Sequence, residues 1–215
     1  NSIRRIIEER VQSFVISDIN IVENNTIFNN DLVIQRLTMM PIVYNKVLKY
    51  NIDKLSIKLD ITNDKDYPIV IKSKDLVFFH EDKEIENLIS YSEIILAQNI
   101  LPGQIIQFIA YLHKDESSVH AAYKHTCKNI YHFKLDNQLI NTMMEEQNIT
   151  DEKDKVDFKL SNQIYKKTKK GLPETYIYEM ESNGIMSVKE TLKIGIELLI
   201  VKMGDIIELV KTDTL

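Results

Sequence analysis

Histidine and cysteine are the side chains of this sequence whose types and spacing could do chemistry. The chain of 215 residues has five histidines and one cysteine, and His120, His125 and Cys127 lie closest together. Imidazole and thiolate groups bind zinc, and either group, once activated, could serve a small hydrolase. These residues lack the His-Glu-x-x-His spacing, and no carboxylate pair accompanies them at metal-ligand spacing. Three unrelated residues around a loop are therefore the better interpretation.

Motifs for phosphate binding and covalent catalysis are missing from the sequence. Its five glycines are isolated, so none of them forms a glycine-rich phosphate loop. No Gly-x-Ser-x-Gly elbow is present, and Cys127 has no catalytic signature around it. A single cysteine also excludes a disulfide within the chain. We expect a chain that is not itself an enzyme and that binds no metal or cofactor.

A run of lysines at Lys166–Lys170 is the candidate for contact with nucleic acid. Without interleaved aromatic residues, such a run is more often a solvated loop. The formal net charge of −5 also does not suit a protein that coats a phosphate backbone. A free-standing nucleic-acid-binding module that uses this loop stays the alternative function.

Composition places the chain among folded globular proteins. Hydrophobic residues make up 44% and charged residues 27%, which is the ordinary balance for a protein with a core. The apolar runs are too short to span a membrane, and Asn1–Val11 carries arginines and glutamates instead of the apolar core of a signal peptide. The expectation is an intracellular protein.

Short alternating segments predict a run of mostly antiparallel strands through the middle of the chain. The clearest is Lys54–Thr62, where Leu55, Ile57, Leu59 and Ile61 alternate with polar residues. An earlier strand, Ser13–Glu23, is expected to place Val15, Ile19 and Ile21 on one face. The further predicted strands are Pro68–Lys72, Leu76–His80, Ile94–Ala97, Gln104–His113, Ile130–Leu135 and Tyr176–Glu181.

Helices are predicted at both ends of the chain and at two points between. Asn1–Gln12 has apolar residues at helical spacing, and Asp31 is the expected N-cap of a short helix that ends before Pro41. Another helix is expected over Gln138–Gln147. The charged stretch that follows, at about 150–170, is expected to be an exposed connection.

The last helix carries more apolar surface than a helix lying on a sheet needs. Ser187 and Glu190 fit a capping box at its start. A second apolar face must be covered by another part of this chain or by a partner. We expect one stripe to pack on the chain's own sheet, and the other to join the helix Asn1–Gln12 against a partner. The stripes are Val188, Leu192, Ile196, Leu199, Met203, Ile206 and Val210, and Ile194, Leu198, Val201 and Leu209.

Several segments resemble the alpha-like subunits of multisubunit DNA-directed RNA polymerases. The matches occur in family order, span most of the chain, and favour the third-largest subunit of RNA polymerase II and its archaeal counterpart over bacterial alpha. In chain order they are Asn1-Ser-Ile-Arg-Arg, the strand and turn in Ile16–Ile27, Asp31 to Arg36 and Pro41, Leu101-Pro102-Gly103-Gln104, Val119-His120-Ala121, and the strand, turn and helix in Tyr176–Leu199.

The resemblance implies a two-domain α+β fold. A discontinuous alpha-like dimerisation domain, residues 1–43 and 171–215, is interrupted by an insert domain of mostly antiparallel strands, residues 44–170. The implied function is that of a non-catalytic assembly subunit for transcription. The chain would pair with a smaller alpha-like subunit, separate or fused, and would anchor the second-largest subunit. Magnesium chemistry would lie on the two largest subunits, and DNA and RNA would be contacted only through the complex.

The resemblance also suggests site residues, which we state as expectations. Contact with the second-largest subunit is expected at Arg4, Arg5, Arg36 and His120. From spacing alone, Arg4 and Arg5 could equally pair with Glu8 and Glu9 on a solvated face. The expected dimer interface consists of Ile3, Ile7, Ile194, Leu198, Val201 and Leu209.

Three departures from the family pattern are visible. Relatives carry a strand before the first helix, so the sequence is either a fragment or a chain without an ordered N-terminus. The metal-binding cysteines of some relatives are absent, and Ala122 and Lys124 stand where relatives have lysine and a small residue. The excess of Ile, Asn and Lys suits an AT-rich genome or a large DNA virus. The expected location is the nucleus for a cellular eukaryotic protein, and a cytoplasmic factory or virion for a viral one.

Overall fold

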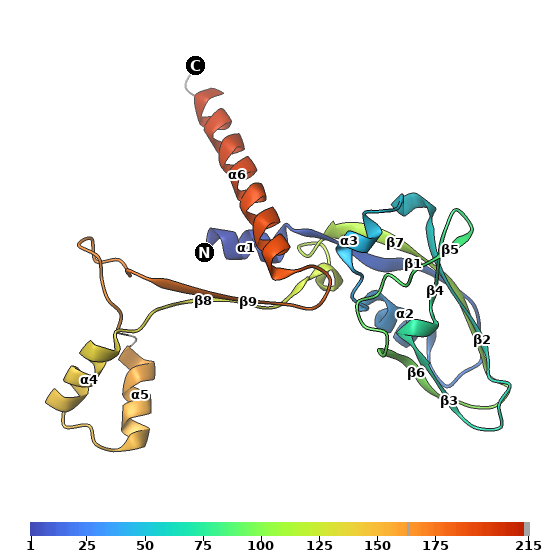
Figure 1. Cartoon of the computed structure of the whole chain (residues 1–215), viewed down its shortest axis with the longest axis horizontal. Coiled ribbons are helices and arrows are strands. Elements are labelled where there is room, and N and C mark those ends of the chain that lie inside the picture. The colour runs from blue at the N-terminus through green and yellow to red at the C-terminus, as the bar shows by residue number, and fades with distance from the viewer. Residues whose placement is uncertain (163, 213–215) are drawn as a thin grey trace. The chain divides into compact units, whose positions relative to one another are not determined.

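The computed structural model describes residues 1–162 and 164–212, and the chain forms two compact units (Figure 1). The first unit combines Asn1–Cys127 with the described part of Glu181–Leu215, and the second is Lys128–Met180. Helices and antiparallel sheets occur together, which confirms the α+β class. The division into 1–43 with 171–215 and 44–170 stays a prediction, because compact units do not show which segments dimerise.

A five-stranded antiparallel sheet forms the body of the first unit. The strand order is β1-β7-β2-β4-β5, and β3 pairs separately with β6. The predicted antiparallel arrangement is therefore confirmed. The elements of this unit are α1 Ser2–Glu9, β1 Gln12–Asn24, α2 Asn30–Thr38, α3 Tyr44–Val47, η1 Ile52–Lys54, β2 Leu55–Thr62, β3 Ile69–Lys72, η2 Ser73–Asp75, β4 Val77–His80, β5 Lys83–Ile85, β6 Ile95–Ile100, β7 Ile105–Glu116, η3 Ala121–Tyr123 and α6 Val188–Thr212.

The main core of the first unit collects buried side chains from the sheet, from β3 and β6, and from α2. The alternation that predicts β2 places Leu55, Ile57 and Leu59 in this core. Helix α2 is capped by Asn29, whose side chain accepts a hydrogen bond of 3.1 Å from the backbone N–H of Asp31. The prediction that Asp31 is the N-cap was therefore wrong by two positions.

A β-bulge in β1 exchanges the two faces of that strand. The register of β1 on β7 shifts between Ser17 and Asn20, and Asp18 adopts a left-handed conformation with φ of 47°. The prediction that Val15 shares a face with the apolar residues beyond the bulge was wrong, because the extra residue reverses the alternation. Val15 packs with η3 instead. The side chains of β1 that face the main core are Phe14, Ile16, Ile19 and Ile21.

The second unit contains a two-stranded ribbon and two helices. β8 pairs with β9, and α4 contacts α5. The region at about 150–170, predicted as an exposed connection, contains helix α5, so that prediction was wrong in part. Acidic Glu152 and Asp154 in the first turn and Lys159 in the last turn suit the helix dipole, although α5 buries none of its residues. The bounds are β8 Thr126–Phe133, α4 Asn137–Glu146, α5 Glu152–Asn162 and β9 Tyr176–Ser182.

Candidate interaction surface on helices α1 and α6

The turn before α6 is fixed to the body of the first unit. Ile185 and Met186 are buried, and the Ile185 carbonyl accepts a hydrogen bond of 2.9 Å from the backbone N–H of Tyr44. At the start of the helix, the backbone N–H of Glu190 donates to Ser187 Oγ at 3.3 Å, which confirms the hydroxyl half of the predicted capping box.

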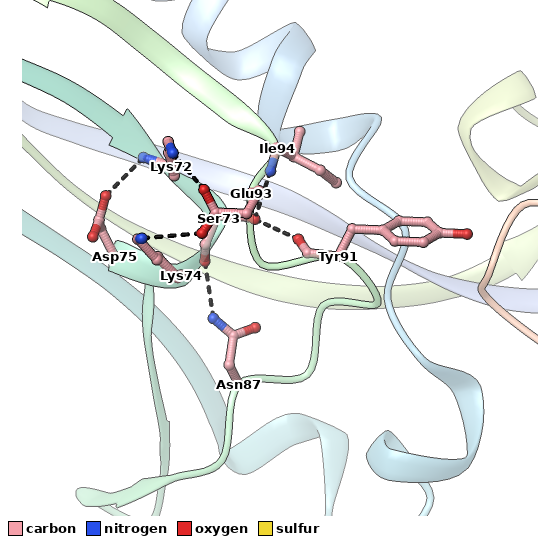
Figure 2. A network of polar contacts seen from close by, with 8 residues as sticks. All are labelled: Lys72, Ser73, Lys74, Asp75, Asn87, Tyr91, Glu93 and Ile94. Atoms are coloured by element: carbon pink, nitrogen blue, oxygen red, sulfur yellow. Dashed lines mark hydrogen bonds and ion pairs between the residues drawn. The ribbon is translucent and has the colours of Figure 1, made fainter.

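A polar network holds the loop that supports this turn (Figure 2). The Ser73 hydroxyl donates to the Tyr91 carbonyl and accepts from the Ile94 N–H, while the Asn87 amide donates to the Ser73 carbonyl at 2.9 Å. Hydrogen bonds from Lys72 and Lys74 hold the pKa of the Glu93 carboxyl below its usual range. The network thereby fixes residues 87–94 on η2.

Gly184 lies against this loop without room for a side chain. Its φ is +95°, and a Cβ built there would lie 2.5 Å from Ser90 Oγ and 2.9 Å from the Tyr91 hydroxyl. The glycine turn before α6 therefore packs against the loop that this network holds.

Helix α6 packs mainly on α1 (Figure 1). Ile7 of α1 is fully buried, and a Cβ built on Gly195 would lie only 2.5 Å from Ile7 Cγ1. The two backbones approach closely because Gly195 has no side chain. The prediction that one stripe of α6 packs on the chain's own sheet was wrong, since the main contact of the helix is with α1.

The outer half of α6 is exposed and rich in apolar residues, and its charged residues Lys202, Asp205, Glu208 and Lys211 follow one another at spacings of three. All described side chains from Ile200 to Lys211 are exposed, and Ile200 and Leu209 reach 65% and 63%. Ile200 and Ile207 belong to neither predicted stripe, and the signal that could have found them is their spacing of seven residues, which places both on one face of the helix. The large exposed apolar residues here are Ile200, Val201, Met203, Ile206, Ile207, Leu209 and Val210.

A cavity of about 300 Å³ opens between α1 and α6. Leu199 and Met203 line it from α6, and the charged side chains that line it are Arg5, Glu9, Arg10 and Lys202. We call this cavity and the exposed outer half of α6 the α1–α6 surface. It offers apolar contact beside charged side chains of both signs.

The six residues predicted at the dimer interface all lie on α1 or α6, and their role stays a prediction. Ile7 supports the surface from beneath, since it has no exposed area. The partly buried members are Ile3, Ile194 and Leu198, and the exposed members are Val201 and Leu209.

The two arginines of α1 make the local ion pairs that their spacing predicts. Arg4 Nη1 lies 2.7 Å from Glu8 Oε2, and Arg5 Nε lies 3.8 Å from Glu9 Oε1. The Arg5 side chain keeps 64% of its area exposed, so its pair with Glu9 contributes little to stability.

The loop that carries His120 is joined to the end of α1. The Ser118 N–H donates to the Glu9 carbonyl at 3.2 Å, and Arg10 pairs with Glu116 at 3.1 Å. The exposed His120 accepts a hydrogen bond at Nδ1 from the Ala122 N–H and so caps η3. The structure therefore brings His120 and the α1 arginines to one region of the first unit.

Arg36 lies elsewhere in the first unit, on α2. Its guanidinium donates to the Leu96 carbonyl at 2.7 Å and lies over the Phe28 ring, 5.4 Å from the centroid. Arg36 also lines a cavity of about 450 Å³ with Met39 and Ile95. Its contact with a second subunit stays a prediction, and within the chain it ties α2 to β6.

The three residues nearest to a metal cluster in the sequence have different environments. His120 caps η3, Cys127 is exposed, and His125 is fully buried. Burial lowers the pKa of His125 to about 4, which the backbone of Tyr123 partly offsets. Among residues 1–162 and 164–212, no group of three histidine, cysteine or acidic side chains is arranged to hold a metal ion.

None of the helices in the described ranges has the length and apolar content to cross a bilayer. No family model matches the chain, and no curated protein matches its sequence.

Proposed function

We propose that this chain is a non-catalytic assembly subunit of a DNA-directed RNA polymerase. It pairs with a smaller alpha-like subunit through the α1–α6 surface and anchors the second-largest subunit. The observation that carries the proposal is the outer half of α6, where large apolar side chains are exposed beyond the part of the helix that α1 covers. The order of the family-like motifs along the chain is the reason for proposing an alpha-like subunit as the partner.

Burial of this surface supplies a large driving force for pairing. Covering one exposed Leu or Ile side chain contributes roughly 1.5–3 kcal/mol, which exceeds the value of an exposed ion pair. Large exposed apolar side chains that are contiguous mark an interaction surface, and α1 covers only the inner part of this helix. A partner with its own pair of apolar helices would complete a four-helix arrangement.

Contacts with the second-largest subunit are proposed at two places of the first unit. Arg4, Arg5 and His120 lie near the joint between α1 and the η3 loop, and Arg36 lies on α2. Magnesium-dependent nucleotide transfer is assigned to the two largest subunits.

Co-expression with a candidate smaller alpha-like subunit tests the proposal. The molar mass of the purified complex, measured by size exclusion with light scattering, should equal one copy of each chain. Val201→Glu combined with Leu209→Glu should abolish pairing while the circular dichroism spectrum of the chain stays unchanged, because both side chains are exposed. The matched control is Lys189→Gln with Lys193→Gln, which changes the net charge equally and should leave pairing intact.

Two outcomes would contradict the proposal. One is a stable monomer that does not bind the candidate partner at any concentration tested. The other is equal loss of pairing in the test and control variants, because charge and not the apolar surface would then govern association.

A further inference from the structure

Aromatic rings of the second unit gather around Phe133. The Phe133 ring centroid lies 4.9 Å from that of Tyr165, 5.4 Å from that of Tyr176 and 6.4 Å from that of Tyr131. Tyr131 and Tyr176 are exposed, Tyr176 to 55%. The sequence gives no sign of this cluster, because its members come from β8, from β9 and from the segment before the lysine run.

The structure therefore supplies the aromatic partners that the lysine run lacks in the sequence. Lys166–Lys170 follow Tyr165 directly, and Lys167 Nζ lies 5.7 Å from the Tyr165 ring centroid. Lys166 pairs with Glu174 at 3.2 Å. The described residues place no carboxylate within ion-pair distance of Lys167, Lys169 or Lys170.

Two cavities adjoin the aromatic cluster within the second unit. One of about 410 Å³ is lined by Tyr131, Phe133 and Leu135 together with Lys159. Another, of about 580 Å³, is lined by Lys134 and Lys166 and also by the acidic Asp136 and Glu174. Leu135 lines both cavities, so the rings that line the first lie close to the lysines that line the second.

We propose that the second unit binds single-stranded nucleic acid. Bases stack on the exposed rings of Tyr131 and Tyr176, and phosphates lie along Lys167, Lys169 and Lys170. This function goes beyond the proposed assembly role, because the α1–α6 surface belongs to the first unit.

The geometry favours a single strand over a duplex or an acidic protein. Stacking on a side-chain ring needs unpaired bases, which a duplex does not expose, and an acidic peptide would use the lysines without the rings. The carboxylates beside the run are Glu174, which pairs with Lys166, and Asp136, which lines the same cavity as Lys166. The lysines available to phosphate are therefore Lys167, Lys169 and Lys170, which have no ion pair among the described residues.

Fluorescence anisotropy of the full chain with labelled oligonucleotides of about 20 residues tests this function. Oligo(dT), oligo(rU) and a mixed-sequence duplex are the three probes, so that DNA, RNA and duplex binding are compared directly. Both single strands should bind more tightly than the duplex. If one of the two single strands binds more tightly, its sugar shows whether the natural ligand is DNA or RNA.

Two variants separate stacking from charge. Tyr176→Leu keeps apolar volume against Phe133 but removes the ring, and should weaken binding about fivefold or more, whereas Tyr176→Phe should bind like the wild type. Lys169→Glu with Lys170→Glu should make the slope of log affinity against log salt shallower by about 1.4, which corresponds to two lost phosphate contacts.

The matched control is Lys153→Glu with Lys155→Glu on α5, which changes the net charge equally and should leave binding unchanged. The proposal is overturned by equal weakening in the control, by equal affinity for the duplex, by displacement of the oligonucleotide by polyglutamate, or by absence of binding at low salt. None of these results affects the pairing experiment, so the two proposals fail separately.

Discussion

Burial fixes the charge state of His125. The ring is neutral in the folded chain, because desolvation lowers its pKa from 6.5 to about 4, while in the unfolded chain it takes up a proton below about pH 6.5. Protonation of His125 in the unfolded chain therefore lowers the free energy of unfolding as the pH falls from about 6.5 to about 4, and has no effect above that range. The size of this loss is about 3 kcal/mol.

We predict that His125→Gln removes this pH-dependent part of the free energy of unfolding. Urea unfolding at neutral and acidic pH should show a smaller fall in the free energy of unfolding for the variant than for the wild type. Carboxylates titrate in both proteins, so the difference between the two isolates His125. Identical pH profiles would show that the buried ring does not control the acid sensitivity.

Two glycines of α6 give a matched test of the α1–α6 contact. A Cβ on Gly195 would meet Ile7 Cγ1 at 2.5 Å, whereas a Cβ on Gly204 meets nothing within 4 Å. Alanine raises helix propensity equally at both sites, so that gain cancels in the comparison. We predict that Gly204→Ala is more stable than Gly195→Ala by about 1–3 kcal/mol, the usual cost of overpacking. Equal melting temperatures would mean that α1 does not pack on Gly195 in solution.

Among the elements, β1 shows how one residue sets the faces of a strand. Asp18 occupies the bulge with φ of 47°, a conformation that glycine adopts without strain. We predict that Asp18→Gly stays within about 1 kcal/mol of the wild type, whereas deletion of Asp18 prevents folding. The deletion would turn Ile19 and Ile21 away from the main core. Circular dichroism and thermal melting of both variants measure the outcome, and a folded deletion variant would contradict the proposed role of the bulge.

Local patterns predicted the elements whose buried face or helix cap can be read from neighbouring residues. Strict alternation identified β2, and Ser187 with Glu190 marked the start of α6. The bulge at Asp18 was not predictable, because it depends on the register with β7. Helix α5 was missed because it buries no residue, so no apolar periodicity distinguishes it from a charged connection.

The candidate site could be predicted only in part for a related reason. A stripe of apolar residues shows that a helix face is covered, but not by what. The sequence thus indicated the apolar surface of α6, including Val201 and Leu209, but it wrongly assigned the sheet as its neighbour. The close approach of Gly195 to Ile7 depends on two segments from opposite ends of the chain. The aromatic cluster around Phe133 depends in the same way on the pairing of β8 with β9.

For the whole molecule, the division into two units predicts that the second can be removed. The chain leaves and re-enters the first unit at neighbouring points, since Asn183 donates from its backbone N–H to the His125 carbonyl at 3.3 Å and from Nδ2 to the Lys124 carbonyl at 2.7 Å. These hydrogen bonds lie inside the first unit and survive the excision. Replacing residues 128–180 by a Gly/Ser linker of about four residues should therefore cost little loop-closure entropy.

The excised chain should keep its cooperative thermal transition and its pairing through the α1–α6 surface, and it should lose affinity for single-stranded oligonucleotides. Light scattering with the alpha-like partner measures the pairing, and anisotropy measures the affinity for single-stranded oligonucleotides. The control is the full-length chain that carries the same linker inserted after Thr150, an exposed residue between α4 and α5, and it should retain both activities. A shortened chain that unfolds would show that the first unit depends on the second for its stability. A shortened chain that still binds oligonucleotides would move the nucleic-acid site to the first unit, because the rings and lysines argued to form it would then be gone.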